Sequence, residues 1–326
     1  MKSQQCKIKF YSAISLCALL FSLSQYPTFS APLATDEKPG KTSFNRVSLP
    51  SESIGKLTVF IPAADVEEDK QTGEVRNAAG VFTIPAKCKL GIKLNYAGGT
   101  NLKALLSVPG SLMRKLELNS LEIDNLGMDT ISKLENLAYL DMSGTDITDG
   151  GAVQVAKLKN LEVLNLSFLQ ITGKTIEAVA TLPRLTRLFT CNTQMGDGIA
   201  PALARMKMMR KLSIVSAGLT DKSIPEIAKL TDLEQLQLSR NNITDKSIDQ
   251  ILKLKKLVRL NLADTRVTIN GLLRLKALPQ LRCLLFRLTD LKEDDLKRLK
   301  TALPKVILEE GSKAREYDKS IFDSLH

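Results

Sequence analysis

The sequence predicts an α/β solenoid, in which a curved parallel β-sheet is covered on its outer side by helices. The first observation is an apolar pattern that recurs every twenty-four residues from Met113 to about Thr301 without a slip. The second is a change of period within each unit, from strand-like alternation in the first part to a helix-like spacing of three in the last. Such units bury their apolar side only by stacking on their neighbours, which produces a solenoid.

Each of the eight units carries seven apolar positions, and only Thr190 breaks the pattern. A Thr-Asp pair lies between the strand and the helix of several units, and such residues accept hydrogen bonds from the free amides of a helix N-terminus. We therefore expect helices to begin at these pairs, which are Thr148-Asp149, Thr220-Asp221 and Thr244-Asp245. The second apolar position is always leucine, at Leu116, Leu140, Leu164, Leu188, Leu212, Leu236, Leu260 and Leu284.

The pattern Leu-x-x-Leu-x-Leu-x-x-Thr/Asn-x-Ile-Thr-Asp resembles that of the leucine-rich repeat family, in its version with a helical convex side. The resemblance covers residues 89–308 and implies a right-handed horseshoe of about eight full repeats with a concave parallel sheet. Ile92 and Leu94 keep the register, which places a degenerate first repeat near residue 89. Leu121 and Leu169 replace the Asn or Thr of the turn, so we expect those turns to lack the family's side-chain-to-backbone hydrogen bond.

Residues 1–30 have the features of a secretory signal peptide, with three lysines, an apolar core of about fifteen residues and small residues before Ala31. The core is shorter than the roughly twenty residues of a membrane span, so we expect no transmembrane segment after cleavage. The alternative is that this segment stays uncleaved and anchors the protein in a membrane. Because a signal peptide directs export, we expect the protein in the periplasm, on the cell surface or in the medium. The absence of cysteine-rich caps favours a bacterial source, whereas two Asn-x-Ser/Thr sequons leave a eukaryotic one open.

The remaining segments lie on either side of the repeats. Residues 31–55 are rich in Pro, Ser, Thr and Lys without an apolar period, and we interpret them as a flexible linker. Residues 56–88 contain two β-like stretches that predict a β hairpin capping the open N-terminal end of the solenoid. Residues 309–326 are interpreted as a C-terminal tail or cap, because apolar residues recur there at a spacing of four.

The residue types argue against most kinds of catalytic site. His326 is the only histidine and the last residue, so Ser-His and Cys-His arrangements lack a general base. No metal-ligand spacing and no glycine-rich phosphate loop occur, so we expect a non-enzyme without cofactor or metal. Cys191 and Cys283 lie four units apart, roughly 19 Å at the spacing of neighbouring strands, which is too far for a disulfide. Catalysis by a reactive Cys191 is the alternative from the enzyme class.

The formal net charge of +11 bears on the kind of partner. No basic run is interleaved with aromatic residues as a nucleic-acid platform requires, which argues against nucleic acid. An acidic protein, an acidic peptide or an anionic polysaccharide fits the charge better. We expect a monomer.

Alternation along the strands predicts which side chains face the concave side. Apolar and aromatic groups gather there in units two to five, and basic groups follow in the later units. Aromatic and arginine side chains are typical of interface hot spots. The competing interpretation is that these residues are tolerated exposed groups or are partly buried at the sheet edge. The predicted partner-binding residues are Tyr139, Asp141, Phe168, Arg187, Phe189, Lys211, Arg240 and Arg259.

The sequence thus predicts non-enzymatic recognition of a protein or peptide by the concave face of an exported protein. Aromatic side chains would be its anchors, and basic side chains would meet acidic groups. One alternative is binding of an anionic cell-wall polysaccharide, for which Tyr139 and Phe189 would supply stacking surfaces in the absence of tryptophan. The other is an envelope-structural role, in which the solenoid is a rigid spacer.

Overall fold

The computed structural model describes residues 43–63, 70–71, 75–287 and 292–310. The chain divides into two compact units, residues 1–41 and 42–326, and only the second contains described residues. The predicted signal peptide and residues 311–326 of the predicted tail therefore lie outside the described part of the chain.

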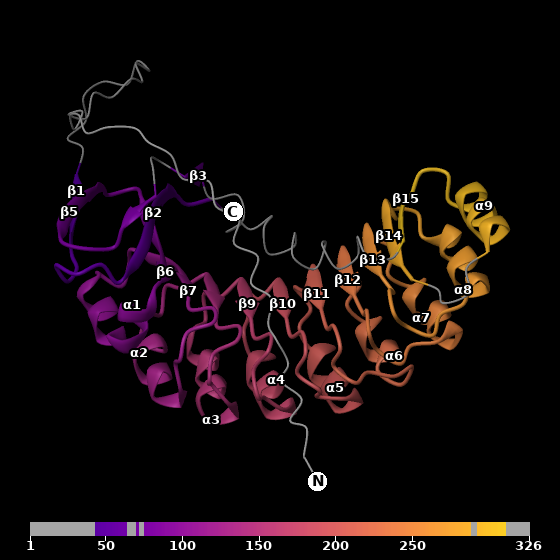
Figure 1. Ribbon diagram of the computed structural model, residues 1–326, viewed down its shortest axis with the longest axis horizontal. Coiled ribbons are helices and arrows are strands. Elements are labelled where there is room, and N and C mark those ends of the chain that lie inside the picture. The colour runs from indigo at the N-terminus through magenta and orange to yellow at the C-terminus, as the bar shows by residue number, and fades with distance from the viewer. Residues whose placement is uncertain (1–42, 64–69, 72–74, 288–291, 311–326) are drawn as a thin grey trace, which may run out of the picture. The chain divides into compact units, whose positions relative to one another are not determined.

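The repeats form one parallel β-sheet with a strand from each unit, which confirms the predicted solenoid (Figure 1). The row runs from β6 (Lys89–Leu94) to β15 (Ile307–Glu310), and each strand is hydrogen-bonded to the next. Leu188 pairs with Leu164 on one side and Leu212 on the other, so the register joins residues twenty-four apart. The strands between are β7 (Met113–Glu117), β8 (Tyr139–Asp141), β9 (Val163–Asn165), β10 (Arg187–Phe189), β11 (Lys211–Ser213), β12 (Gln235–Gln237), β13 (Arg259–Asn261) and β14 (Cys283–Phe286).

Short helical segments cover the outer side of the repeat sheet (Figure 1). Apolar residues recur in them at every third position along the chain, a spacing that suits both an α turn and a 3₁₀ turn. Of the helices in the described residues, none has the length and apolar character that crossing a bilayer requires. The α-helices are α1 (Tyr96–Thr100), α2 (Met128–Ile131), α3 (Asp149–Ala152), α4 (Gly173–Val179), α5 (Ala200–Leu203), α6 (Ile224–Ile227), α7 (Ile248–Ile251), α8 (Ile269–Arg274) and α9 (Glu293–Ala302). The 3₁₀ helices are η2 (Leu102–Ser107), η3 (Asn125–Gly127), η4 (Val153–Lys157), η5 (Asp197–Ile199), η6 (Asp245–Ser247) and η7 (Leu275–Ala277).

The core lies between the sheet and these helices. The second-position leucines of all eight units are at most 1% exposed. Thr190, which breaks the apolar pattern, is buried as well, and its Oγ1 donates a hydrogen bond to the Ser213 carbonyl oxygen at 3.4 Å. This bond offsets the cost of burying a hydroxyl group among leucines.

The N-terminal cap differs from the predicted hairpin. Strand β2 (Gly55–Ile61) pairs antiparallel with β6 and extends the repeat sheet, with β3 (Lys70–Gln71) and β4 (Arg76–Asn77) as short partners on its other edge. Strand β5 (Val81–Pro85) pairs instead with β1 (Phe44–Ser48) in a separate two-stranded sheet. The two β-like stretches therefore do not pair with each other. By pairing with β6, strand β2 satisfies backbone groups that an open sheet edge would expose.

The predicted flexible linker is wrong from residue 44 onward. Val47, on β1, and Leu49 and Ile54, which follow it, are buried in the same hydrophobic core as the repeats. These apolar residues lie in a five-residue strand and a turn, a stretch too short for a period to be visible in the sequence. The register of the degenerate first repeat is confirmed, because Ile92 pairs with Leu116.

The Thr-Asp pairs connect neighbouring units as well as capping helices. Thr244 Oγ1 accepts a hydrogen bond from the Lys246 amide at 3.3 Å, which confirms the cap of η6. Thr220 Oγ1 accepts from the Lys222 amide at 3.3 Å, but helix α6 begins later, at Ile224, without a side-chain cap, so the cap predicted at Thr220 is wrong. The Asp221 carboxylate of the preceding unit accepts from the Thr244 amide at 2.8 Å and from its hydroxyl at 2.6 Å. The same contact recurs between Asp149 and Thr172, Asp197 and Thr220, and Asp245 and Thr268.

The cap predicted at Thr148 is not formed. Asn125 of the preceding unit occupies the position of these aspartates, and its Oδ1 accepts from the Thr148 amide at 2.9 Å. Because a side-chain amide, unlike a carboxylate, also donates hydrogen bonds, Asn125 Nδ2 donates to the Thr148 hydroxyl oxygen at 2.9 Å. Helix α3 consequently begins without a side-chain cap.

The hydrogen bonds to threonine change the acidity of the aspartates. Partial burial acts to raise the pKa of Asp221, but the hydrogen bonds from Ser247 and Thr244 outweigh it, so the pKa lies below its usual value. The pKa of Asp149 is lowered in the same way, with burial outweighed by its hydroxyl and amide donors. The Asp149 and Asp221 carboxylates therefore bind protons more weakly in the folded state than in the unfolded state.

We expect an Asp149→Asn/Asp221→Asn variant to lose stability less steeply in acid than the wild type. Because the folded pKa lies below the unfolded value of about 3.9, the stabilisation is fully present above that value and is lost as pH falls through the folded pKa. Thermal unfolding midpoints measured from neutral pH down to about pH 2 test this. The control is Asp294→Asn, whose carboxylate contacts Lys297 on α9. Equal slopes in the double variant and the wild type would contradict the prediction.

One buried side chain, Asn241, satisfies the turns of two units. Its Oδ1 accepts from the amides of Ala217 at 3.1 Å and Leu219 at 3.0 Å. Its Nδ2 donates to the carbonyl oxygens of Ile214 at 2.6 Å and Leu238 at 3.0 Å. The leucines at this position in two other units have no polar atom with which to form such bonds. Losing Asn241 would leave several buried backbone groups without a partner.

We expect Asn241→Leu to lower the free energy of unfolding by about 3 kcal/mol, since each unsatisfied buried group costs about 1–3 kcal/mol. The matched control is Thr265→Val at the same position one unit later, where Oγ1 makes a single bond to the Leu262 carbonyl at 2.7 Å. That variant should lose about 1 kcal/mol. Urea unfolding of both variants checks the difference, and similar losses in the two would refute it.

Candidate functional site

The register places the predicted binding residues in columns that cross the strands on the concave side. Tyr139, Arg187, Lys211 and Arg259 belong to one column, and each is aligned with the matching residue of the neighbouring strand. Two residues later along each strand, a second column contains Asp141 on β8, and Phe189 on β10. The strand pairing therefore aligns these residues in two columns across the sheet.

The central members of these columns are buried, in line with the competing interpretation that they are not free for a partner. Tyr139, Val163 and Phe189 pack with Ala138 into one buried cluster, in which Phe189 is only 3% exposed. Neighbouring strands lie about 4.8 Å apart, and side chains on the inner side of a curved sheet converge, which reduces the exposed area of each. Tyr139 and Phe189 therefore do not present an exposed ring to a partner.

The charged members of the columns differ in exposure. Arg187 is buried, whereas Lys211 and Arg259 are half-buried. Asp141 is buried too, and its Oδ1 accepts hydrogen bonds from the Ser143 amide at 2.8 Å and hydroxyl at 2.7 Å. Burial raises the pKa of Asp141 above its usual value, although these bonds act in the opposite direction. Asp141 thus holds the end of its own strand and is not presented to solvent.

The exposed groups of the concave side lie where each strand ends. One residue of each unit from β7 to β13 has a positive φ there. In the first six of these units its amide donates to a carbonyl of the next unit, as Phe168 does to Cys191 at 2.8 Å. We call this series the left-handed rim. Its members are Ser120, Gly144, Phe168, Asn192, Ser216, Arg240 and Asp264.

Phe168 is the exception on the left-handed rim. Its φ is +62°, and its side chain is 58% exposed. A left-handed conformation costs a residue with a Cβ roughly 1–2 kcal/mol, and glycine and asparagine adopt it most readily. A bulky aromatic side chain in this conformation, and in solvent, satisfies no requirement of the fold.

Arg240 lies on the same rim, three units further along the chain. Its Nε is 3.8 Å from Asp264, and Arg287 Nη1 is 3.3 Å from the same carboxylate. Two arginines and one aspartate leave a local formal charge of +1. At about 4.8 Å per strand, this group lies roughly 14 Å from Phe168.

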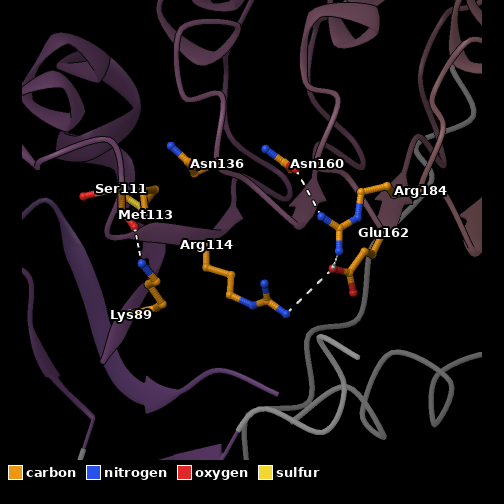
Figure 2. Close-up of a pocket in the computed structure, with 8 residues that line it drawn as sticks. All are labelled: Lys89, Ser111, Met113, Arg114, Asn136, Asn160, Glu162 and Arg184. Carbon is orange, nitrogen blue, oxygen red and sulfur yellow. Dashed lines mark hydrogen bonds and ion pairs between the residues drawn. The ribbon is translucent and has the colours of Figure 1, made fainter. Parts of the chain in front are cut away.

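A polar cavity of about 180 Å³ lies at the opposite ends of the strands, where the sequence analysis predicted no site (Figure 2). Arg114 and Arg184 reach the Glu162 carboxylate, each at 3.8 Å (Figure 2). The signal in the sequence was the column just before the strands, in which Arg114 and Glu162 lie forty-eight residues apart. The lining residues are Lys89, Ser111, Met113, Arg114, Asn136, Asn160, Glu162 and Arg184.

The described cysteines form no disulfide, and for Cys191 and Cys283 the distance between their strands had already excluded one. Cys191 is buried, with its Sγ 3.4 Å from Ser213 Oγ. Burial, and then the nearby Glu309 carboxylate, raise the pKa of the Cys283 thiol, which disfavours the nucleophilic thiolate. Within the described residues, no group of three or more His, Cys, Asp or Glu side chains is placed to hold a metal ion.

Comparison with known proteins matches two segments, residues 133–156 and 229–251, to the family model described as Leucine Rich repeat. No curated protein matches the chain. A similar solved structure is an internalin from Listeria monocytogenes, with 20% identity, a TM-score of 0.45 and coverage of 61% of this chain and 67% of its own.

Two further solved structures are similar over part of their length. A leucine-rich repeat protein from Leptospira interrogans has 21% identity and a TM-score of 0.48, and the match covers 64% of this chain and 56% of that one. The PEPR1–AtPEP1 structure has 14% identity and a TM-score of 0.37, with coverage of 69% and 34%. The match thus spans little more than half of the Leptospira protein and about a third of the PEPR1–AtPEP1 chain.

The two matched segments have the same apolar register as the units around them. Every unit from β7 to β13 is built as a strand, a turn and a helical segment on the outer side of one parallel sheet. The matched segments are therefore similar to leucine-rich repeats, and together with the units around them they form an α/β solenoid.

Proposed function

We propose that this chain is an exported, non-enzymatic recognition protein that binds a protein or peptide through the left-handed rim of its concave side. Phe168 is the anchor, and the group formed by Arg240, Asp264 and Arg287 meets acidic groups of the partner. The signal-like features of residues 1–30 support export. The proposal moves the anchor from Tyr139 and Phe189, which are buried, to the rim.

The conformation and exposure of Phe168 carry the proposal. Most other members of the rim are small or polar, and such residues adopt a positive φ at lower cost. Residues held in sparsely populated backbone conformations cluster at binding and catalytic sites, where function compensates for the lost stability. An exposed aromatic side chain is also the type of residue that dominates binding energy at interfaces.

The charged group supplies a second, weaker contact. Arg240 and Arg287 share the Asp264 carboxylate at 3.8 and 3.3 Å, distances longer than that of a charge-assisted hydrogen bond, about 2.7–2.9 Å. An acidic group of a partner can therefore compete for these guanidinium groups. The partner that fits best carries an apolar side chain and an acidic group roughly 14 Å apart.

We expect Phe168→Asn to stabilise the fold and to weaken binding. Relief of the left-handed strain should raise the free energy of unfolding by about 1 kcal/mol. Loss of the aromatic anchor should weaken binding by tenfold or more, since hot-spot truncation costs about 2 kcal/mol. The measurements are urea unfolding and affinity capture from the producing cell's envelope and medium, followed by titration of the purified captured species.

The matched control is Ser216→Asn, at the same rim position two units later. It tests the backbone effect without removing an aromatic side chain, and it should leave binding unchanged. If Phe168→Asn retains the captured species as well as the wild type does, the rim is not the binding surface. Capture of nothing by any of the proteins would favour the rigid-spacer alternative.

A further inference from the structure

The cavity of Figure 2 is crossed by an ion pair between two long charged side chains, Arg114 and Glu162. Arg114, Ala138 and Glu162 occupy the same position in three successive units, just before the strand or at its start. Arg114 and Glu162 form an ion pair across the unit that lies between them. Ala138 of that unit packs into the buried cluster with Tyr139 and Phe189 and is not among the residues that line the cavity.

The cavity has an excess of positive charge. Lys89, Arg114 and Arg184 contribute three positive charges and Glu162 one negative charge, so the formal sum is 3 − 1 = +2. Lys89 Nζ donates to a neutral group, the Ser111 carbonyl oxygen, at 2.6 Å. Figure 2 shows Lys89 on the other side of Arg114 from Glu162, so the Glu162 carboxylate does not serve as its counter-ion.

Glu162 compensates its two arginines without closing the space. Both ion pairs measure 3.8 Å, longer than a charge-assisted hydrogen bond of about 2.7–2.9 Å. Arg184 is further held by Asn160, whose Oδ1 accepts from its Nη1 at 3.3 Å. A guanidinium positioned in this way can turn its donors to a second carboxylate.

We propose that this cavity is a carboxylate-binding site that receives an acidic side chain of a protein or peptide. The side-chain amide of Asn136 adds hydrogen-bond donors to the positive charges, whereas Asn160 Nδ2 donates to the Glu135 carbonyl oxygen at 3.0 Å. None of the eight lining residues is aromatic, so a uronic-acid ring would find no stacking surface. A cavity of about 180 Å³ accommodates a single acidic side chain.

The site is separate from the left-handed rim. Glu162 immediately precedes β9, whereas Phe168 follows that strand, so the two sites lie at opposite ends of the same strand. A partner can use both, but neither requires the other. Substitutions at Phe168 should therefore leave carboxylate binding in the cavity unchanged, which separates a failure of this proposal from a failure of the proposed function.

The test is an NMR titration of the full chain at low ionic strength with tri-glutamate, and with tri-lysine and trigalacturonate as the other probes. Lys89→Met and Arg184→Met should each weaken tri-glutamate binding roughly fivefold, the effect of losing about 1 kcal/mol of ion pairing. Glu162→Gln should strengthen it by a similar factor, because it removes a like charge beside the ligand. Phe168→Asn should leave the affinity unchanged.

The matched control is Arg205→Met, which removes an exposed arginine that pairs with Glu177 away from the cavity. It should leave binding unchanged. The opposite sign expected for Glu162→Gln distinguishes binding from a structural role, since a variant that merely damaged the cavity would bind more weakly. The proposal is overturned if tri-glutamate does not bind, if trigalacturonate or tri-lysine binds more tightly, or if Lys89→Met and Arg184→Met behave as the control does.

Discussion

No single unit of this chain can bury its own leucines, and the whole structure depends on stacking the units at a constant register. Leu188 is buried because Leu164 and Leu212 lie beside it, and they are buried for the same reason. A unit of twenty-four residues completes one circuit of strand, turn and helical segment. A slip of one residue would bring polar side chains into the leucine column. The interior is therefore uniform in type along the chain, and chemical variety is confined to side chains that point away from it.

Stacking also requires that backbone groups be satisfied where strand pairing ends. The aspartate-threonine contacts do this beside the helices, Asn241 does it inside a turn, and the amide bonds of the left-handed rim do it at the strand ends. Where a residue satisfies such backbone groups with a side chain suited to its conformation, this structural role explains its residue type. Phe168 has the backbone bond of the rim but not a residue type that suits a positive φ, and this mismatch is the reason for proposing it as a binding residue.

Periodicity was sufficient to locate strands such as β10 and to assign Tyr139, Arg187 and Phe189 to their columns, because a buried face enforces a strict period. It failed for β1, whose five residues pair with β5 more than thirty residues away and carry no repeat. It also failed for the exposure of Tyr139 and Phe189. Alternation shows which way a side chain points, but not how closely its neighbours approach it on the inside of a curve.

The residue pattern alone was enough to predict the solenoid, the twenty-four-residue register, the cap at Thr244 and the membership of each column. These properties follow from local propensity and from a repeat that every unit obeys. Three properties appear only in the folded chain: which concave side chains stay exposed, the positive φ of Phe168, and the cavity lined by Arg114 and Glu162. These depend on the curvature of the sheet and on the reach of side chains across units, and neither is encoded in the residue types of a single repeat.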